Sequence, residues 1–410
     1  MTTEYCIKED SKFDLEKMID HGAIKTVFHP ICSLASQRII GFEALSRGIW
    51  KDEVISPLKI FNEAQLIGKE LELDRLCRAK ALSAFSENFR NSNHLLFLNI
   101  NTAVLTKATV GSNIFNTVVA QAGIDAERIV IEILESETKD EKYLLKFVDH
   151  YRKLGFKIAL DDVGMGSSNL NRIAILRPSV VKIDRFLIKN IHKEHYKRAV
   201  ARGLIDIAHE VGAIVVAEGV ENETEAVACL EEGADSIQGF YFTEPKAETK
   251  EVIEICDEKI IKLTEQYRSY SITALNKKKK RTFDQNRIFS YLTSMLQQEV
   301  DLEKVESLFD ETSVKSSKLE CFYILDLNGI QLSSTIGIKK KQRGNSIFGP
   351  AEKGTDHGMK RYYISLASGL KKYISDPYLS FATGKICQTL AGFFLRGGQE
   401  YILCADFSYE

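Results

Sequence analysis

The sequence predicts a protein of the α/β class, with a (β/α)8 barrel of the TIM type followed by a long helix and a smaller α+β domain. Its 410 residues leave room for about two domains. Short apolar runs alternate with helical stretches between residues 27 and 239, which is the pattern of parallel strands joined by helices. Beyond residue 248 one long amphipathic run gives way to aromatic-rich, strand-like segments.

Eight strands are expected in the first region, each a short apolar run enriched in β-branched residues. They lie at 27–31, 39–45, 95–100, 129–133, 157–161, 180–183, 213–218 and 235–239. The first two are joined only by SLASQR, which is too short for a crossover helix, so this pair must be an antiparallel hairpin. Three predicted helices are followed by glycines in C-cap position, Gly155, Gly212 and Gly233.

The composition limits the partners that are expected. Hydrophobic residues make up 44% and charged residues 27%, as in a chain that folds around a core. The net charge of -2 gives no general attraction to nucleic acid or to an anionic membrane. No apolar stretch is long enough for a membrane span and the N-terminus lacks a signal-peptide pattern, so a cytoplasmic location is expected. The eight cysteines lack C-x-x-C spacing and are expected to be reduced core thiols.

Polar residues stand at the ends of seven of the eight predicted strands, where barrel enzymes carry their active sites. A single acid there is more often a helix N-cap or a loop anchor, but that role does not explain so many. The residues are Glu43, Asn99, Glu132, Asp161 with Asp162, Lys182 with Asp184, Glu218 and Gln238.

These residue types favour one kind of chemistry. Carboxylate and amide oxygens suit Mg²⁺ or Mn²⁺ rather than Zn²⁺. The adjacent Asp161 and Asp162 could serve two ions, and such a pair can activate a water for attack on phosphorus. Lys182 and Asp184 share a strand face, and the lysine could hold or deprotonate that water or neutralise a phosphate. The residues predict metal-dependent phosphodiester hydrolysis, with a metal-binding barrel without turnover as the alternative.

Seven motifs then follow one another in a specific order. They are GFEALSR at 41–47, FLNIN at 97–101, IEILES at 131–136, DDVGMGSSNL at 161–170, VVKIDR at 180–185, VAEGVEN at 216–222 and QGFYF at 238–242. This series resembles the EAL domain of the bacterial cyclic-di-GMP phosphodiesterases, over about residues 20–247. The resemblance implies hydrolysis of cyclic di-GMP to linear pGpG with two ions of Mg²⁺ or Mn²⁺.

The resemblance also implies a role for each matching residue. The implied metal ligands are Glu43, Asn99, Glu132 and Asp161, with Asp162 for the second ion. The implied catalytic group consists of Lys182, which would orient or activate the water, together with Glu218, Asp184 and Glu135. The implied substrate contacts are Leu45, Arg47, His29, Glu221 and Gln238.

The chain departs from the family pattern in two places. Loop 161–170 reads DDVGMGSSNL where DDFGTGYSSL is usual, so it keeps Gly164 and Gly166 but lacks both aromatic side chains. In the family this loop couples metal binding and dimer contacts to activity, and Glu135 matches the acid that anchors it. This altered loop favours the rival interpretation, a catalytically silent cyclic-di-GMP receptor. His29 stands where glutamine is usual and is either a substrate contact or a satisfied core histidine.

A connecting helix is expected after the barrel, which gives domains at 1–247, 248–305 and 306–410. Its apolar stripe over 252–267 is wider than one domain needs, which predicts a homodimer through this helix and loop 161–170. The basic run 277–281 is expected to be a solvated face or a turn, followed by a shorter helical segment at 286–311.

The closing stretch 361–408 resembles the PAS-like sensory domains of the Cache type. The resemblance implies a regulatory domain that binds an unknown small ligand, with Arg361, Tyr363, Tyr378 and Asp406 as candidate pocket residues. The alternative is that the tyrosines are core residues and Arg361 is a surface charge.

Overall fold

The computed structural model describes residues 13–102, 105, 113–134, 141–165, 170–298, 318–337 and 349–409. The chain folds into two compact units that divide between Ser271 and Ile272. Each unit has its own buried core, so each is described by itself.

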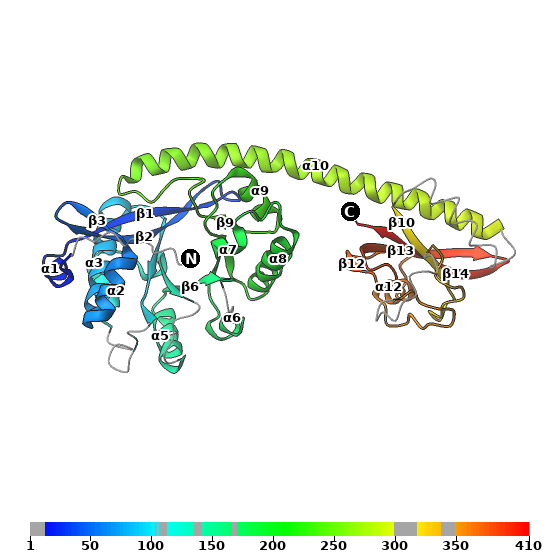
Figure 1. Ribbon diagram of the computed structural model, residues 1–410, viewed down its shortest axis with the longest axis horizontal. Coiled ribbons are helices and arrows are strands. Elements are labelled where there is room, and N and C mark those ends of the chain that lie inside the picture. The colour runs from blue at the N-terminus through cyan, green and yellow to red at the C-terminus, as the bar shows by residue number, and fades with distance from the viewer. Residues whose placement is uncertain are drawn as a thin grey trace, which may run out of the picture. The chain divides into compact units, whose positions relative to one another are not determined.

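The first unit contains a closed barrel of eight strands with helices around it (Figure 1). The strands follow the order β1-β9-β8-β7-β6-β5-β4-β2, and β1 also pairs with β2 to close the barrel. The strand β1 is antiparallel to both neighbours, so the predicted hairpin is confirmed. The bounds are β1 Ile24–Ser33, β2 Arg38–Trp50, β4 Leu95–Asn99, β5 Ile129–Leu134, β6 Lys157–Val163, β7 Val180–Ile183, β8 Ile214–Ala217 and β9 Ser236–Ile237.

All eight predicted strands are present, and one short strand was not predicted. This is β3, Glu53–Ile55, which pairs with the end of β2 outside the barrel. Two of its three residues are exposed, so it lacks the apolar run by which the others were recognised.

Helices follow most of the strands. They are α1 Leu15–Asp20, α2 Pro57–Ile67, α3 Glu70–Phe89, α4 Ile114–Gln121, α5 Glu141–Lys153, α6 Asn171–Leu176, α7 Arg185–Ile188, α8 His195–Glu210 and α9 Glu223–Glu231, with the 3-10 turn η2 at Ala126–Arg128. The predicted C-cap glycines Gly155, Gly212 and Gly233 have φ of 96°, 79° and 103°. This left-handed conformation is why glycine ends these helices.

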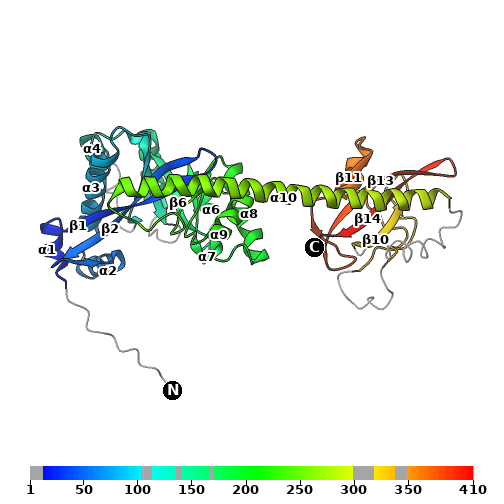
Figure 2. The same cartoon turned by 90° about the horizontal axis from the view of Figure 1, so that it is seen from above.

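The helix α10, Thr249–Gln298, is a single helix of 50 residues (Figure 2). The prediction of two separate helical segments was therefore wrong. No glycine or proline interrupts the stretch, and Lys and Arg are good helix formers, so the basic run 277–281 continues the helix. Lys277–Lys280 are exposed, as the prediction of a solvated face requires.

The second unit is built on an antiparallel sheet in the order β10-β14-β13-β11, with β12 paired to β13. Its elements are β10 Leu319–Leu325, α12 Arg361–Ala367, β11 Lys372–Ile374, β12 Tyr378–Leu379, β13 Ile386–Arg396 and β14 Gln399–Ser408. Alternate residues of β10 face opposite sides. Phe322 and Ile324 share a core with the end of α10, whereas Tyr323 and Leu325 pack with Tyr362 of α12.

Seven cysteines are described, and all seven are buried and free, as predicted; Cys6 lies outside the described residues. No helix in the described part of the chain combines the length and the apolar character that crossing a bilayer requires.

Candidate functional site

The polar strand ends form a ring inside the barrel because of the two-residue periodicity of the strands. An apolar cluster in the barrel includes Phe97, Val130, Ala159, Val180 and Val216, which belong to five neighbouring parallel strands. Two residues further along each strand the side chain points to the same face. Those positions hold Asn99, Glu132, Asp161, Lys182 and Glu218.

On β2, Gly41 precedes Glu43 by two residues, just as each residue of the apolar cluster precedes a polar residue on its own strand. A Cβ atom at Gly41 would lie 2.9 Å from Cε2 of Phe97 and 2.6 Å from the Leu95 carbonyl oxygen. The motif therefore needs glycine at this position because the Phe97 ring fills the space below the ring of polar side chains.

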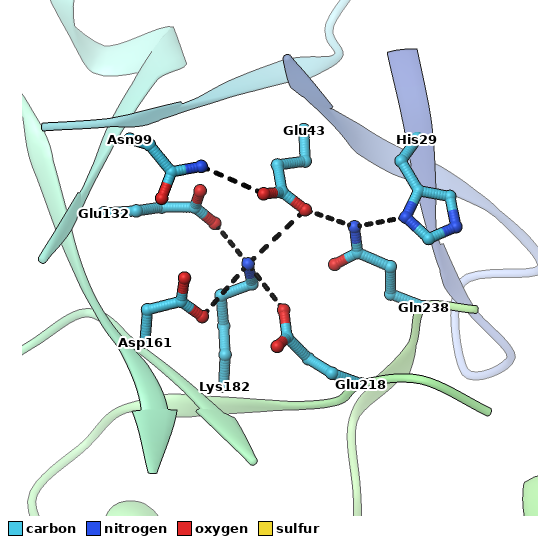
Figure 3. A network of polar contacts seen from close by, with 8 residues as sticks. All are labelled: His29, Glu43, Asn99, Glu132, Asp161, Lys182, Glu218 and Gln238. Atoms are coloured by element: carbon cyan, nitrogen blue, oxygen red, sulfur yellow. Dashed lines mark hydrogen bonds and ion pairs between the residues drawn. The ribbon is translucent and has the colours of Figure 1, made fainter. Parts of the chain in front are cut away.

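Lys182 lies at the centre of that ring (Figure 3). Its Nζ atom lies 2.5 Å from Glu218, 2.6 Å from Glu132, 3.2 Å from Asp161 and 3.6 Å from Glu43. Burial alone would lower the pKa of Lys182, but the surrounding carboxylates raise it well above its usual value. The lysine is therefore an ammonium ion that holds four carboxylates together.

The four carboxylates around Lys182 carry more negative charge than its single ammonium group can balance. Burial raises the pKa of Glu132 and of Glu218 well above the usual range, and it also raises that of Asp161. Burial would likewise raise the pKa of Glu43, but the nearby Lys182 turns the shift downward. A ring with this excess of negative charge favours an additional cation.

Asp162 projects from a bulge at the end of β6. The register between β6 and β7 shifts between Leu160 and Val163, and Asp162 has a φ of 56°. Bulges of this kind re-aim side chains beside active sites. Burial, and then the charges of Asp161 and Asp184, raises the pKa of Asp162 to about 6.

The side chains present fit hard divalent cations. One oxygen each from Asp161, Asp162 and Glu218 lies within 4.8 Å of the other two. Apart from the ion pairs to Lys182, both oxygens of Glu132 and Oδ1 of Asp161 have no hydrogen-bond partner among the described residues. Oxygen donors with spare acceptor capacity are the ligands that Mg²⁺, Mn²⁺ and Ca²⁺ take.

A second chain of contacts orients Glu43. Its Oε1 accepts a hydrogen bond of 3.0 Å from the Asn99 amide. Gln238 Nε2 donates to Glu43 Oε2 at 2.6 Å and to His29 Nδ1 at 2.9 Å (Figure 3). His29 is buried, and burial lowers its pKa, so a neutral ring accepts this bond. His29 therefore positions Gln238 through Nδ1, whereas its buried Nε2 has no hydrogen-bond partner among the described residues, so a substrate contact through Nε2 stays a prediction.

The remaining predicted residues lie around this ring. Leu45 and Arg47 follow Glu43 at two-residue intervals on β2, so the three share a strand face. Asp184 caps α7 by accepting a hydrogen bond of 2.7 Å from the Phe186 backbone N–H. Glu221 is exposed and forms an ion pair with Arg185. Glu135 lies outside the described residues.

The altered loop is described only in part, since residues 166–169 lie outside the described ranges. Val163 is buried in the barrel core with 1% of its surface exposed, whereas Met165 is 61% exposed. A phenylalanine at 163 would therefore add volume to a packed core, which costs about 1–3 kcal/mol unless neighbours repack.

Two supporting residues were missed from the sequence. Asp74 on α3 accepts a hydrogen bond of 3.3 Å from the backbone N–H of Asn101, two residues after Asn99, and pairs with Arg78. Arg185 pairs with Glu221. An aspartate inside the apolar face of α3 was the available signal for Asp74, and Arg185 stands in the motif VVKIDR.

In the second unit, Arg361, Tyr378 and Asp406 line one cavity. The prediction that Tyr363 belongs to it was wrong. The Tyr363 hydroxyl donates to the Leu327 carbonyl at 3.1 Å, and its ring covers Gly329 in the turn after β10.

Comparison with known sequences identifies one family and several relatives. The profile of the EAL domain matches residues 13–245. The uncharacterized EAL-domain containing protein YkuI of Bacillus subtilis is 26% identical over 379 residues, which span 89% of this chain and 90% of YkuI. The probable cyclic di-GMP phosphodiesterase PdeI of Escherichia coli is 28% identical over 263 residues, 60% of this chain. The match spans only 33% of PdeI.

Two solved structures extend the comparison. YkuI in complex with substrate c-di-GMP and calcium has a TM-score of 0.81 at 22% identity and covers 97% of this chain and 100% of that one. This likeness concerns the fold. A manganese/cy-diGMP complex of BlrP1 from Klebsiella pneumoniae is 26% identical with a TM-score of 0.50, over 55% of this chain and 56% of that one.

Proposed function

The chain belongs to the EAL domain family, and we propose that it hydrolyses cyclic di-GMP to linear pGpG with two Mg²⁺ or Mn²⁺ ions. The observation that carries the proposal is the ring itself. Asn99, Glu132, Asp161, Lys182 and Glu218 all sit one strand repeat above the apolar cluster and face the same space. A protein that only binds the dinucleotide does not need this complete set.

The metal-binding part of the proposal assigns the ions to Glu43, Asn99, Glu132, Asp161 and Asp162, with Glu218 beside them. When bound, such ions activate a water and stabilise the leaving oxygen. Gln238 and Asn99 hold the Glu43 carboxylate from both sides, which keeps its oxygens in one orientation.

We assign Lys182 the role of orienting the attacking water by donating a hydrogen bond to it. Its carboxylate neighbours hold the proton on the ammonium, so Lys182 is a poor base. Glu218 follows β8 and its carboxylate lies 2.5 Å from Lys182 Nζ, so we propose that Glu218 contacts the water directly. Asp184 follows β7, the strand of Lys182, and is proposed as a supporting residue of the same site.

Substrate contacts are proposed along β2 and β9. Leu45 would form an apolar wall for a guanine, and Arg47 would pair with a phosphate through its guanidinium. Gln238 Oε1 is buried and has no partner among the described residues, so it offers an acceptor to a ligand. Glu221 already forms an ion pair with Arg185, and we propose that it contacts the substrate from the exposed edge of the site.

The deciding experiment incubates the purified full chain with cyclic di-GMP and Mg²⁺ or Mn²⁺ and separates the products by chromatography. Formation of pGpG supports the proposal. Glu43→Ala and Asp161→Ala should each lower the rate by roughly 100-fold or more, because each removes a carboxylate that stabilises the ions. Exposed Glu16→Ala is the matched control and should keep the wild-type rate. Wild-type rates in both ring variants would contradict the metal assignment.

A second candidate function is a receptor that binds cyclic di-GMP without turnover. The observation in its favour is the altered loop, which lacks the aromatic side chains that are usual at 163 and 167. Saturable binding of cyclic di-GMP together with no pGpG in the presence of either metal would establish this function instead.

For the second unit we propose a PAS-like regulatory domain over 306–410, joined to the barrel domain 1–247 by the helical region 248–305. Bridges from Phe322 to Ile336 and from Leu325 to Gln331 place segment 331–336 beside β10. Added to the five strands of the sheet, this segment gives six antiparallel segments with α12 on one face, an arrangement that supports the proposed sensory role.

A further inference from the structure

The helix α10 contributes one side chain to the loop that follows β9. Lys259 Nζ donates a hydrogen bond of 2.5 Å to the Tyr241 carbonyl and one of 2.8 Å to the Phe242 carbonyl. The ammonium also lies 5.6 Å from the centre of the Tyr241 ring. Lys259 stands beyond residues 13–245, the part of the chain that matches the EAL profile. A residue of α10 is therefore attached to the loop that begins with Gln238.

The two carbonyl groups have no other donor among the described residues. Phe242 is fully buried, and its N–H donates to the Gly239 carbonyl at 3.1 Å, which closes a turn over 239–242. A carbonyl that loses its only donor in a buried setting is unfavourable, and a hydrogen bond from an ammonium group is stronger than one between neutral groups. Lys259 therefore fixes where this turn lies.

The turn 239–242 packs against the segment that follows β8. A Cβ atom at Gly239 would lie 2.2 Å from the Val220 carbonyl oxygen and 2.4 Å from the Val220 nitrogen, so the two backbones are in direct contact. The Val220 N–H donates to the Gln238 carbonyl at 3.1 Å. Val220 comes two residues after Glu218. The position of the turn is therefore coupled to both polar strand ends, Gln238 and Glu218.

Gln238 connects this turn with the expected cation site. The residue is 2% exposed, and its amide group donates to Glu43 at 2.6 Å and to His29 at 2.9 Å. Glu43 is held from its other side by Asn99. Partners that orient a metal ligand contribute to metal affinity, although they do not touch the metal. A turn that shifts would loosen the hold of Gln238 on Glu43.

We propose that Lys259 is a positioning residue of the candidate site, because it fixes the turn 239–242 and so keeps Gln238 in contact with Glu43. The helix α10 then supports the site in addition to leading into the second unit. The inference rests on the proposed metal-dependent function of the barrel and adds to it a residue outside the matched family profile.

The test measures the affinity of the purified full chain for Mn²⁺ by calorimetry, without nucleotide. Lys259→Met keeps the length of the side chain but removes its donors and its charge. We expect this variant to raise the Kd for Mn²⁺ about fivefold or more. Lys259→Arg keeps the donors and the charge and should stay within about twofold of wild type. The matched control is Lys250→Met, which changes an exposed lysine of the same helix and should leave the Kd unchanged.

A double variant separates positioning from a general loss of structure. Gln238→Ala should by itself raise the Kd for Mn²⁺ about tenfold. Adding Lys259→Met to it should change the Kd by less than about twofold, because the lysine acts through Gln238, whereas a merely structural role predicts effects that add. Fluorescence of Trp50 identifies any variant that does not fold. If Lys259→Met is such a variant, Lys259→Gln replaces it and should raise the Kd about twofold or more.

The phosphodiesterase assay on the same proteins keeps this inference separate from the proposed function. A wild-type chain that binds Mn²⁺ but forms no pGpG would contradict the proposed hydrolysis, while the Mn²⁺ affinities still decide the role of Lys259. The inference is overturned if the Lys259 variants bind Mn²⁺ as the wild type does, if Lys250→Met weakens binding equally, or if the effects of Lys259→Met and Gln238→Ala add. A wild-type chain that binds no Mn²⁺ overturns it together with the metal assignment.

Discussion

Lys182 is the residue on which the arrangement of the candidate site depends most. Its ammonium contacts carboxylates from β2, β5 and β6 and the one that follows β8, so a single side chain joins four parts of the barrel wall. Removing it leaves those carboxylates buried and facing one another. Its contribution to stability and its contribution to catalysis can therefore be measured separately.

We predict that Lys182→Ala loses roughly 100-fold or more of the hydrolysis rate but still binds cyclic di-GMP, because the ammonium acts on the water. Without metal, the variant should also unfold about 3–5 kcal/mol more easily, since a buried ion-pair cluster loses its cation. Denaturant unfolding and calorimetry check both, with exposed Lys189→Ala as the control. A loss of affinity parallel to the loss of rate would instead identify Lys182 as a phosphate anchor.

Asp406 provides a residue-scale prediction for pH. Burial raises its pKa from 3.8 to about 6 in the folded chain. The folded state therefore holds this proton more tightly than the unfolded state, and the resulting stability is complete below pH 3.8 and lost as pH rises through 6. This difference between the folded and unfolded pKa of Asp406 corresponds to about 3 kcal/mol.

The Asp406→Asn variant should lack this pH-dependent contribution to stability. Unfolding of both proteins is followed between pH 3.5 and 7.5, and the stability difference between wild type and variant should change by up to about 3 kcal/mol over that interval. A difference that does not vary with pH would contradict the raised pKa.

At the scale of the elements, α10 contains residues in two different environments. Val252, Cys256, Ile260 and Leu263 are buried in the core of the first unit, and Ile288, Phe289, Leu292 and Leu296 are buried in that of the second. Residues 272–280 between them are exposed all around the helix. The helix is therefore held by packing at both ends and by its own hydrogen bonds in the middle.

We predict that Leu263→Ala destabilises the first unit by about 2–5 kcal/mol, because it removes a fully buried side chain. Leu275→Ala, on the same helix but 57% exposed, should change stability by less than about 0.5 kcal/mol. The only tryptophan, Trp50 on β2, lets fluorescence follow the first unit alone. Equal effects of Leu263→Ala and Leu275→Ala on stability would show that Leu263 is not packed in the core as described.

At the scale of the whole molecule, the homodimer remains a prediction, but its first reason was wrong. The stripe over 252–267 was expected to be uncovered, whereas its main residues pack against the barrel of the same chain. A different stripe is exposed. Ile261, Ile272, Leu275 and Phe283 lie on one face of α10 at helical spacing and are 54–69% exposed.

We predict that the full chain sediments as a dimer and that Leu275→Glu combined with Phe283→Glu makes it monomeric, since charges on an apolar contact are unfavourable. Ala274→Glu lies on the opposite face of the helix and should leave the dimer intact. A wild-type chain that sediments as a monomer would contradict the prediction. A dimer that persists in the double variant would show that the contact lies elsewhere.

The sequence by itself determined the features that depend on local spacing. Short apolar runs enriched in β-branched residues located eight strands, the length of SLASQR required the antiparallel hairpin, and the strand ends identified the polar residues of the ring. Only the tertiary structure decided which groups meet. Gln238 bonds Glu43 across 195 positions and His29 across 209, and the hydroxyls around Asp406 come from separate strands. Periodicity states which face of an element is apolar, but the shape of the closed barrel and sheet decides what covers that face.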